Sequence, residues 1–550
     1  MSNNRFSVFI PLFIGLALAV GIGIGYFFSG SNGSKKITGL KSTSSSKVND
    51  VLNYIIEEYV DTVNVKNLED DAVVSLLEQL DPHSSYIPAT ELKAVSEQLE
   101  GNFDGIGVEF NIQKDTIMVV AAISGGPSES LGIQSGDRIV RVEKKNVAGT
   151  GIKNDDVIKL LRGKSGSKVK VGIVRPGIKS ITEYEITRGK IPIYSVDASI
   201  MIDAQTGYIK ISRFGATTYD EYMKAFNDLK MKGMNKLVLD LRDNPGGYLN
   251  AAVDICDEFL SKGNKIVYTQ GKARKREDFD ATAKGGFEEG GLVVLIDEGS
   301  ASASEIVSGA VQDNDRGWII GRRSFGKGLV QEEVRFDDGS AMRLTIARYY
   351  TPSGRSIQKS YDQGNDAYYH ELAERYEKAD STKEKPKKAV KSEAFKTPSG
   401  RKVYGGGGIT PDIVIAVDTS GYTPLLAELA SKGMMNRFSF EYTDGKRDAL
   451  KKQYKNAEQF AVGFNAASLI QEFNAFIQKN GIKPNDASLR ISSQIIERQI
   501  KALIARAIFG NSGFYTVLNK SDLGVKKAIE ILKSNKLVTA NGSPKNQDAF

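Results

Sequence analysis

Two short stretches of the sequence carry residue types that could do nucleophilic chemistry. Ser302 lies in a run of small residues, GSASASE, directly after an apolar segment, and Lys327 lies between two glycines in SFGKG, soon after a second apolar segment. A lysine can replace histidine as the base that activates a serine when burial lowers its pKa from about 10.4 toward ~7–8. The chain has only two histidines, His83 and His370, so few positions could supply a Ser-His-Asp triad.

Each of these stretches also has a purely structural interpretation. The serines could cap a helix, and Lys327 could be a surface lysine on a tight turn. The position of Ser302 between an apolar run and a helical pattern would, however, expose it at a helix N-terminus, where free N–H groups stabilise an anion. Ala303 follows without bulk, so its N–H could be an oxyanion donor, and Gln331 lies four residues after the lysine and could orient the amine.

A third stretch, DLRDNPGG at 240–247, ends an apolar run in a charged turn and two glycines. Glycines at this point allow a backbone N–H to turn toward a substrate carbonyl. Loss of one such oxyanion donor costs roughly 3–4 kcal/mol in the transition state. Either Gly246 or Gly247 could supply the N–H, and an ordinary strand-to-helix turn would explain the same residues. Neither the serine-rich nor this glycine-rich loop has the GxxxxGK[ST] spacing of a phosphate-binding loop.

Taken together, these stretches resemble the C-terminal processing peptidases, also called tail-specific proteases, a family of serine peptidases with a Ser-Lys dyad. The resemblance rests on the order of the motifs SASASE, FGKG and Gln331, and on DLR followed by NPGG. LDPHS at 80–84 and YTPSGR at 350–355 also fit the family pattern. The resemblance covers roughly residues 45–417.

The resemblance implies a role for each of these residues. Ser302 would attack the peptide carbonyl, Lys327 would be the general base, and Gln331 would orient the lysine. The N–H groups of Gly247 and Ala303 would form the oxyanion hole, and the reaction would pass through an acyl-enzyme. No metal ion, cofactor or nucleotide is implied.

The same resemblance identifies residues 99–190 as a PDZ domain, which in the family also gates the active site. Consecutive N–H groups in a glycine turn make a nest for a terminal carboxylate, and the next strand offers an edge to which a substrate tail can add. The loop that would bind the substrate carboxylate consists of Gly105, Ile106, Gly107 and Val108. A plain turn is the alternative for these glycines. Arg162 would be a relay residue between this domain and the active site.

The N-terminus indicates a cellular location. Val8 to Phe28 is an uncharged, almost wholly apolar run, and at about 1.5 Å per residue it would span the roughly 30 Å of a bilayer core. A cleaved signal peptide is the alternative, although no Ala-x-Ala pattern follows the run. Lys35 and Lys36 oppose the positive-inside tendency, but long domains translocate largely regardless of such charges. We therefore expect a single-pass protein of the bacterial inner membrane with its catalytic part in the periplasm.

Composition and periodicity divide the chain into segments. We expect a short tail at 1–7, a transmembrane anchor at 8–28, a flexible linker at 29–47, a helical region at 48–98, the PDZ domain at 99–190, the serine protease core at 191–417 and a helical C-terminal domain at 418–550. Strands alternate with helical stretches in the core, which predicts βαβ units and a partly parallel sheet. The predicted fold class is α/β multidomain, with a crotonase-like or ClpP-like protease core and an inserted β-rich PDZ domain.

One segment of the predicted core differs in composition from the rest. Residues 371–402 are low in apolar side chains and dense in lysine and glutamate. This composition is typical of a solvated, mobile insertion, and a helix with alternating charges is the other interpretation for its first part.

Composition also limits the classes of partner and ligand that the protein can bind. The net charge of +7 is spread thinly, without a basic stripe, which argues against nucleic-acid binding. The single cysteine, Cys256, excludes an intrachain disulfide and a Cys/His zinc cluster. We expect protein substrates with apolar C-terminal tails and a contact with the inner membrane through the N-terminal helix. A homodimer and an envelope adaptor protein are further candidate partners, and the C-terminal domain would serve packing, oligomerisation or partner binding.

Two other functions stay open at this point. The first is a PDZ scaffold with an inactive protease domain, which would lack the complete set of Ser302, Lys327 and Gln331. The second is a crotonase-fold enzyme acting on acyl thioesters, which would need neither a PDZ unit nor a membrane anchor and does not use this Ser-Lys pair.

Overall fold

The computed structural model describes residues 47–175, 177–178, 180–379 and 393–534, and the chain divides into two compact units, Met1–Ala72 and Val73–Phe550. In the first unit lie helix α2 (Lys47–Glu58) and the first part of helix α3 (Val65–Glu78), whose remaining residues belong to the second unit. α2 is amphipathic but buries none of its residues. The predicted tail at 1–7, the anchor at 8–28 and all of the linker at 29–47 except Lys47, which begins α2, lie outside the described residues.

The described residues contain no helix that is both long enough and apolar enough to cross a bilayer. The longest helix, α16 (Asp486–Asn519), carries charged residues such as Arg490, Glu497 and Lys501 along its length. This finding contradicts the prediction of a single-pass inner-membrane protein with a periplasmic catalytic part. The segment Val8 to Phe28, on which that prediction rested, lies outside the described residues.

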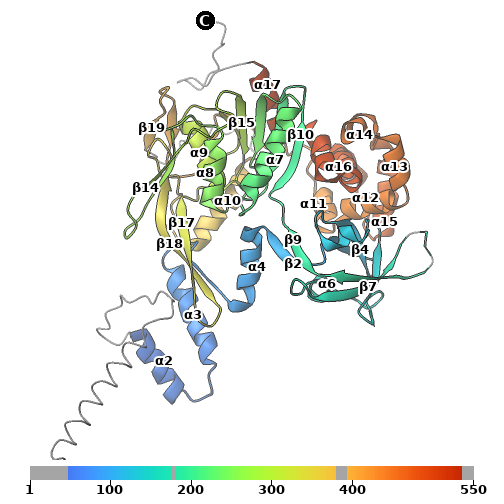
Figure 1. The fold of residues 1–550 in the computed structure, drawn as a ribbon, viewed down its shortest axis with the longest axis horizontal. Helices are drawn as coiled ribbons and strands as arrows, with labels where there is room; N and C mark the ends of the chain where they lie inside the picture. Colours follow the sequence, from blue (N-terminus) through green and yellow to red (C-terminus); the bar gives the residue numbers. More distant parts are fainter. Residues whose placement is uncertain (1–46, 176, 179, 380–392, 535–550) are drawn as a thin grey trace, which may run out of the picture. The chain divides into compact units, whose positions relative to one another are not determined.

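A six-stranded sheet forms the centre of the second unit (Figure 1). Its order is β10 (Val196–Met201), β11 (Thr206–Ile211), β12 (Lys236–Asp240), β15 (Gly291–Ile296), β16 (Trp318–Gly321) and β21 (Ile413–Val414). β10 is antiparallel to β11, and the remaining neighbours are parallel. The mixed α/β core that the alternation of strands and helices predicts is therefore confirmed.

The two faces of this sheet are buried by different elements. Side chains alternate along a strand, so Leu237 and Leu239 of β12 face one side and Val238 the other. On the first side the sheet packs against α7 (Thr218–Met231), α8 (Leu249–Asp257) and α9 (Ala303–Asp313). On the second side it packs against α17 (Leu523–Lys533). Burial on both faces explains why these strands read as continuous apolar runs.

A second, antiparallel sheet supports the other wall of the core. It contains β1 (Ser85–Ile87), β18 (Ala341–Tyr350), β13 (Lys265–Gln270) and β14 (Glu277–Asp280) in that order, with β17 (Leu329–Arg335) also paired to β18. β1 was not expected, because the sequence around it predicts helices, as in α4 (Ala89–Glu100). Pairing with the long strand β18 explains how three residues without a strand pattern form a strand.

The region predicted as a PDZ domain has its own sheet and its own apolar core. The sheet contains β3 (Val108–Gln113), β4 (Thr116–Ala122), β5 (Arg138–Val142), β7 (Lys168–Val174) and β8 (Thr182–Thr187), with β6 (Lys145–Asn146) paired to β5. Helices α5 (Pro127–Ser130) and α6 (Asn154–Leu161) complete the region. β2 (Asn102–Gly105) and β9 (Gly189–Pro192) pair as a separate two-stranded ribbon at its two ends.

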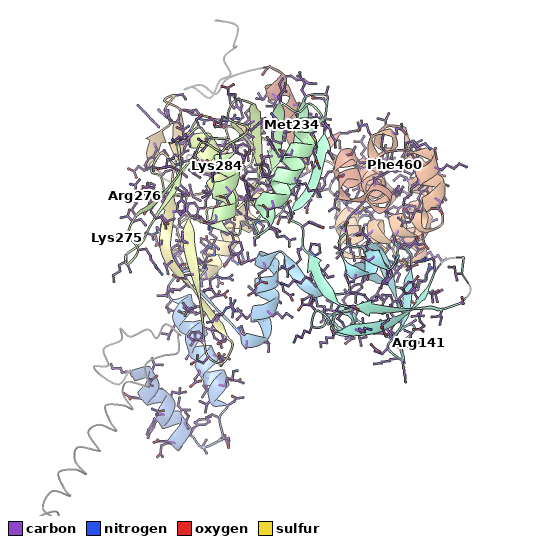
Figure 2. All side chains as sticks on the ribbon, in the orientation of Figure 1. Arg141, Met234, Lys275, Arg276, Lys284 and Phe460 are labelled. Carbon is purple, nitrogen blue, oxygen red and sulfur yellow. The ribbon has the colours of Figure 1, made fainter. Side chains whose placement is uncertain are left out.

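The C-terminal region is a helical bundle with a separate core (Figure 1). Its helices are α11 (Pro424–Ser431), α12 (Met434–Asp444), α13 (Arg447–Gln453), α14 (Ala457–Gly463), a 3-10 turn (Ala467–Leu469), α15 (Ile470–Lys479) and α16. Phe460, labelled in Figure 2, is fully buried in this core and stacks on Phe464 at 4.6 Å between ring centroids. α16 contains a non-helical residue, Gly510, whose φ of 69° marks a kink.

The charged segment at 371–402 is ordered at both ends. Its first part belongs to helix α10 (Asn365–Ala379), and its end contributes to a hairpin of β19 (Ala394–Lys396) and β20 (Lys402–Tyr404). The alternative of a charged helix therefore holds for the first part, and the mobility of the segment stays a prediction. Residues 380–392 lie outside the described residues.

A fully buried ion pair fixes the end of α9. Arg355 donates to Asp313 at 2.7 Å and also to Gln312 at 2.8 Å, and both charged side chains are 0% exposed. Thr351 and Ser353 donate their hydroxyls to the same Asp313 carboxylate. The YTPSGR motif therefore binds the C-terminal end of α9 and makes a structural contribution to the core.

We expect Arg355→Met to destabilise the core by about 3–5 kcal/mol, because the Asp313 carboxylate would remain buried without its cation. The chain has one tryptophan, Trp318 in β16, so the midpoint of urea unfolding followed by tryptophan fluorescence reports on this core. Arg274→Met, which removes an exposed ion pair with Glu332 in the same domain, is the control and should cost about 1 kcal/mol or less. Equal midpoints for the two variants would contradict the prediction.

Candidate active site

The site forms at the carboxyl ends of two neighbouring parallel strands. β12 and β15 pair in register, with Asp240 opposite Leu295, so the loops that follow them start side by side. The loop after β12 carries the two glycines, and the loop after β15 carries Ser302 and leads into α9. The three serines of the second loop have different environments, which separates their functions.

Ser300 and Ser304 fasten the two loops together. Ser300 is buried and donates its hydroxyl to the Leu241 carbonyl at 2.8 Å, and Ser304 is buried and donates to the Asn244 carbonyl at 2.9 Å. Ser302, between them, is half-buried and lines a cleft of the core. Of the three serines, Ser302 is the one available for chemistry on a ligand in that cleft.

Ser302 has an unusual backbone conformation. Its φ of 53° and ψ of −112° lie outside the regions that non-glycine residues commonly adopt. Two hydrogen bonds hold it there: its N–H donates to the Glu305 carboxylate at 2.9 Å, and its carbonyl accepts from the Glu305 N–H at 2.8 Å. The strain is therefore maintained by the first turn of α9.

The glycine loop approaches the serine closely enough to exclude side chains. A Cβ at Gly246 would stand 2.7 Å from the Ser302 Cβ, and one at Gly247 would stand 2.0 Å from the Phe214 carbonyl oxygen. The Gly246 N–H already donates to the Asn244 side chain at 2.9 Å. Gly247 has a φ of 146° and lines the same cleft as Ser302, so its N–H is the better placed of the two to meet a substrate oxygen.

Lys327 reaches the same cleft from a different element. It precedes β17, and it is half-buried in the cleft wall. Burial lowers the pKa of the Lys327 amine below its usual value of 10.5, and the nearby charge of Arg343 lowers this pKa further, while Asp81 and Glu305 raise it. Its Nζ donates to the Gln331 Oε1 at 3.0 Å. The structure thus brings together Ser302, Lys327, Gln331 and Gly247 in one cleft.

The LDPHS motif explains how Gln331 is held. The Asp81 carboxylate accepts from the N–H of His83 at 2.8 Å and from the N–H of Ser84 at 2.9 Å, which fixes a tight turn. The Gln331 Nε2 donates to the carbonyl of His83 in this turn, so its Oε1 is directed at the lysine. The His83 ring bonds to Tyr368 at 2.8 Å, and its burial lowers the pKa of this imidazole to about 4.

Helix α10 also supports the loop that carries Lys327. Arg375 donates to the carbonyl of Ser324 at 2.7 Å, three residues before the lysine. Glu371 accepts from Arg375 and from Arg323, each at 2.6 Å. The charged segment therefore contributes to the position of Lys327, which its composition did not indicate.

Glu305 is a residue that the sequence analysis missed. Its carboxylate is 0% exposed and accepts from the N–H groups of Ser302, Gly326 and Lys327 and from the Ser324 hydroxyl, at 2.5–2.9 Å. One side chain thus bonds the backbone of the serine and of the lysine. Burial raises the pKa of Glu305 to about 7, against the lowering effect of these donors. The spacing of Ser302 and Glu305, that of a capping box, was the available signal.

Tyr349 makes a second link of the same kind. Its buried hydroxyl lies 3.1 Å from the carbonyl oxygen of Ser302 and 2.5 Å from that of Lys327. Burial raises the pKa of this phenol, so it stays neutral and can donate. Nothing in the sequence around Tyr349 indicates this contact, because its two partners are carbonyl groups from distant loops.

The first half of the DLRDNPGG motif is structural. Asp240 is buried and accepts from Arg242 and from the hydroxyl of Tyr208. Burial would raise the pKa of Asp240, but the Arg242 and Lys210 charges together hold it well below its usual range. Arg242 also donates to Asp522, the N-cap residue of α17, at 2.8 Å. This network connects β12 to α17 on the far side of the sheet from α9.

The cleft has a volume of about 880 Å³, which is enough for several residues of an extended peptide. Its wall contains α4 residues Ser96, Leu99 and Glu100, the loop at 245–248 with the start of α8, and residues of β17 and β18. Apolar side chains such as Ile306 and Leu329 alternate with polar ones. In the described part of the chain, no group of three or more His, Cys, Asp or Glu side chains is placed to hold a metal ion.

The predicted carboxylate-binding loop lies between the ribbon and the first strand of its domain. Gly105 ends β2, Ile106 is buried, Gly107 has a φ of 76°, and Val108 begins β3. β3 is an end strand of its sheet as described, so its outer edge can accept a further strand. The role of this loop in binding a substrate carboxylate stays a prediction.

Arg162 connects this domain to α4. Its guanidinium donates to Glu97 at 2.7 Å and lies over the Phe103 ring at 4.5 Å. α4 in turn lines the cleft through Ser96 and Leu99. A path of contacts therefore exists between Arg162 and the cleft, and the relay role stays a prediction.

Three family models match the chain. Residues 205–364 match peptidase family S41, residues 118–175 match the PDZ domain, and residues 425–510 match a family described as of unknown function. The first match covers both Ser302 and Lys327, and the second lies inside the region predicted as a PDZ domain.

The relatives agree with these matches. A carboxy-terminal-processing protease of Bartonella bacilliformis is 36% identical over 320 residues, which are 57% of this chain and 72% of the relative. The carboxy-terminal processing protease CtpA of Bacillus subtilis is 34% identical over 333 residues, or 60% of this chain and 70% of the relative. Among solved structures, the photosystem II D1 C-terminal processing protease is 30% identical, with a TM-score of 0.33 over 57% of this chain and 91% of that one. The chain belongs to peptidase family S41 and is a carboxy-terminal processing serine protease with a PDZ domain.

Proposed function

We propose that this protease cleaves peptide bonds near the C-terminus of its substrates with Ser302 as nucleophile and Lys327 as general base. The observation that carries the proposal is the environment of Lys327: its amine lines the same cleft as Ser302, burial lowers its pKa, and Gln331 accepts one of its hydrogens. A lysine can accept a proton only as the neutral amine, so a lowered pKa favours this role.

The chemistry follows in two half-reactions. Lys327 Nζ takes the proton of the Ser302 hydroxyl while Oγ bonds to the peptide carbonyl carbon, and Lys327 then gives this proton to the leaving amine as the C–N bond breaks. Water repeats the sequence on the resulting ester: Lys327 takes a water proton, the hydroxide bonds to the carbonyl carbon, and the proton returns to Oγ as the ester bond breaks. The N–H groups of Gly247 and Ala303 would stabilise the oxyanion in both steps.

The PDZ domain would capture the substrate by its free C-terminus. The N–H groups of the loop at 105–108 would bind the terminal carboxylate, and the tail would add as a strand to the open edge of β3. Apolar tail residues would contact Val108, Phe110 and Ile112, which pack against the core of this domain. Proteins with apolar C-terminal tails are therefore the proposed substrates. The formation of a homodimer and the binding of an envelope adaptor protein stay predictions.

We expect Ser302→Ala and Lys327→Ala each to lower kcat/KM by at least about a thousandfold on a protein with an apolar tail. Lys327→Arg should be equally inactive, because it keeps the charge but arginine cannot act as a base near neutral pH. Labelling of Ser302 by a serine-directed phosphonate should be lost in all three variants. Substantial cleavage by Lys327→Arg would refute the role of lysine as base.

The acid limb of the pH profile should depend on two groups. Lys327 must be neutral and Glu305 ionised, so kcat/KM should rise as pH increases through the pKa of each, about 7 for Glu305. Glu305→Gln turns two acceptors into one acceptor and a donor that faces N–H groups, so kcat should fall roughly tenfold to a hundredfold. Loss of the Glu305 charge also removes a contribution that raises the pKa of Lys327, so the remaining limb should move to lower pH.

The control for this prediction is Asp412→Asn. Asp412 is another buried carboxylate of the same core, and it accepts from Gln312, Ile319 and Arg401 away from the cleft. The Asp412→Asn substitution should lower the stability of the protein without moving the acid limb of the kcat/KM profile. A limb that stays in place in Glu305→Gln would exclude electrostatic coupling between Glu305 and Lys327.

Capture by the C-terminus predicts a requirement for a free carboxylate. A substrate whose C-terminus is amidated should show a KM raised roughly tenfold to a hundredfold, because charge-assisted hydrogen bonds to the loop at 105–108 are lost. The same substrate with an acetylated N-terminus is the control and should be cleaved normally. Equal cleavage of amidated and free substrates would refute tail capture while leaving the Ser-Lys chemistry intact.

A further inference from the structure

The C-terminal helical domain, α11 to α16, is joined to the protease core through α16, which contacts β10, and through the helix that follows it, α17. α17, which follows α16, packs onto one face of the central sheet, where it contacts strands β12, β15 and β16. The buried residues of α17 in this cluster are Val525, Ala528, Ile531 and Leu532. Burial of these four apolar side chains stabilises the attachment of α17 to the core.

The same helical domain meets the PDZ domain through polar contacts. Asp444 of α12 pairs with Arg138 at 3.0 Å, and Arg447 of α13 donates to the Ser135 hydroxyl at 2.7 Å. Arg506 of α16 pairs with Glu109 at 3.1 Å. The buried apolar clusters of the two domains, as far as the structure describes them, have no residue in common.

The two surfaces approach closely at one glycine. A Cβ at Gly136, which has a φ of 93°, would stand only 2.7 Å from the Asp444 carboxylate. Gly136 therefore leaves room for the carboxylate between Ser135 and Arg138. The two domains are therefore complementary at this contact both in shape, at Gly136 and Asp444, and in charge, at Arg138 and Asp444.

The PDZ domain is attached to the core by a joint that can bend. The chain enters the domain along β2 and leaves it along β9, and these two strands pair only with each other in the described sheets. Gly105 and Gly189 lie opposite one another at the PDZ end of this ribbon. Glycine lacks the side-chain constraint on the backbone, and a two-stranded ribbon without further strands is weak.

We propose that the C-terminal helical domain is a docking platform for the PDZ domain, holding it through Asp444, Arg447 and Arg506 in the position from which a captured tail reaches Ser302. This assigns a role to the segment that matches a family of unknown function. The proposal rests on tail capture by the PDZ domain, as proposed above.

The chemistry of the contact makes the docking reversible. Arg138 and Asp444 are 32% and 20% exposed, and Arg506 and Glu109 are 42% and 45% exposed. Exposed ion pairs are individually weak, and salt screens them. The platform stays on the core when these pairs open, because α17 is held by apolar burial, so the PDZ domain is the part that moves, about the β2–β9 ribbon.

The test uses the full chain with one charge reversed at the contact. In Asp444→Arg, hydrogen–deuterium exchange should accelerate in β2 and β9, and kcat/KM for a protein with an apolar tail should fall roughly threefold to tenfold. The affinity of the PDZ domain for a short tail peptide, measured by fluorescence anisotropy, should not change. The double variant Arg138→Asp/Asp444→Arg restores the pair with reversed polarity and should restore both exchange and kcat/KM.

Glu472→Arg is the matched control, because it makes the same change of charge at an exposed position of α15 in the same domain. It should leave exchange and kcat/KM as in the unmodified protein. Raising the salt concentration should accelerate exchange in β2 and β9 of the unmodified protein and not further in Asp444→Arg. Trp318 fluorescence and the urea midpoint verify that each variant is folded.

Unchanged exchange in Asp444→Arg, an unchanged or raised kcat/KM, or no recovery in the double variant would overturn the docking proposal. Failure of the proposed function is distinguishable, because it would show as cleavage by Ser302→Ala or as indifference to an amidated tail. The exchange measurements require no catalysis and decide the docking in either case.

Discussion

The hydrogen bonds to the Glu305 carboxylate hold the loop of Ser302 and the loop of Lys327 in one arrangement. Four donors point at this side chain: three backbone N–H groups, from Ser302, Gly326 and Lys327, and the Ser324 hydroxyl. A protonated carboxyl group could not accept all four, because its O–H would face donors, so this geometry requires the anion. The anion is buried, and it is stabilised by these donors and by the N-terminal turn of α9. The strained backbone of Ser302 and the approach of the lysine loop both depend on it.

The proposed base, Lys327, is positioned by elements that are far apart in the sequence. Lys327 is positioned by its own loop, by Gln331 on β17, by the turn at 81–84 and by α10. Desolvation favours the neutral amine, whereas the charges of Asp81 and Glu305 favour the ammonium ion. The two influences oppose each other, which under the proposed mechanism would let the amine both accept a proton from serine and return it to the leaving group.

The sequence predicted the parts of the fold that are set by local pattern. Apolar runs and their spacing predict the buried strands β12 and β15 and helix α9. From the order of the motifs we predicted one site containing Ser302, Lys327, Gln331 and Gly247, and these residues line one cleft in the structure. The residues that were missed act through contacts that have no local signature. Glu305 and Tyr349 bond backbone groups of distant loops, and β1 forms only because β18 offers it an edge. The composition of α10 shows its charge but not that Arg375 binds the lysine loop.

The lining of the cleft limits what the outer domains can do. The described residues that line it come from α4, from the loops after β11, β12 and β15 and the helices α7, α8 and α9 that follow them, and from β17 and β18 with their flanks. None of them belongs to the PDZ sheet or to α11–α16. Neither domain therefore contributes a group to the chemistry. Each can change the rate only by changing how long, and in what position, a substrate segment occupies the cleft. The C-terminal bundle contacts the PDZ domain through ion pairs, and α17, which follows the bundle, packs on the face of the sheet away from α9, so the PDZ domain is the route by which the proposed docking would affect cleavage.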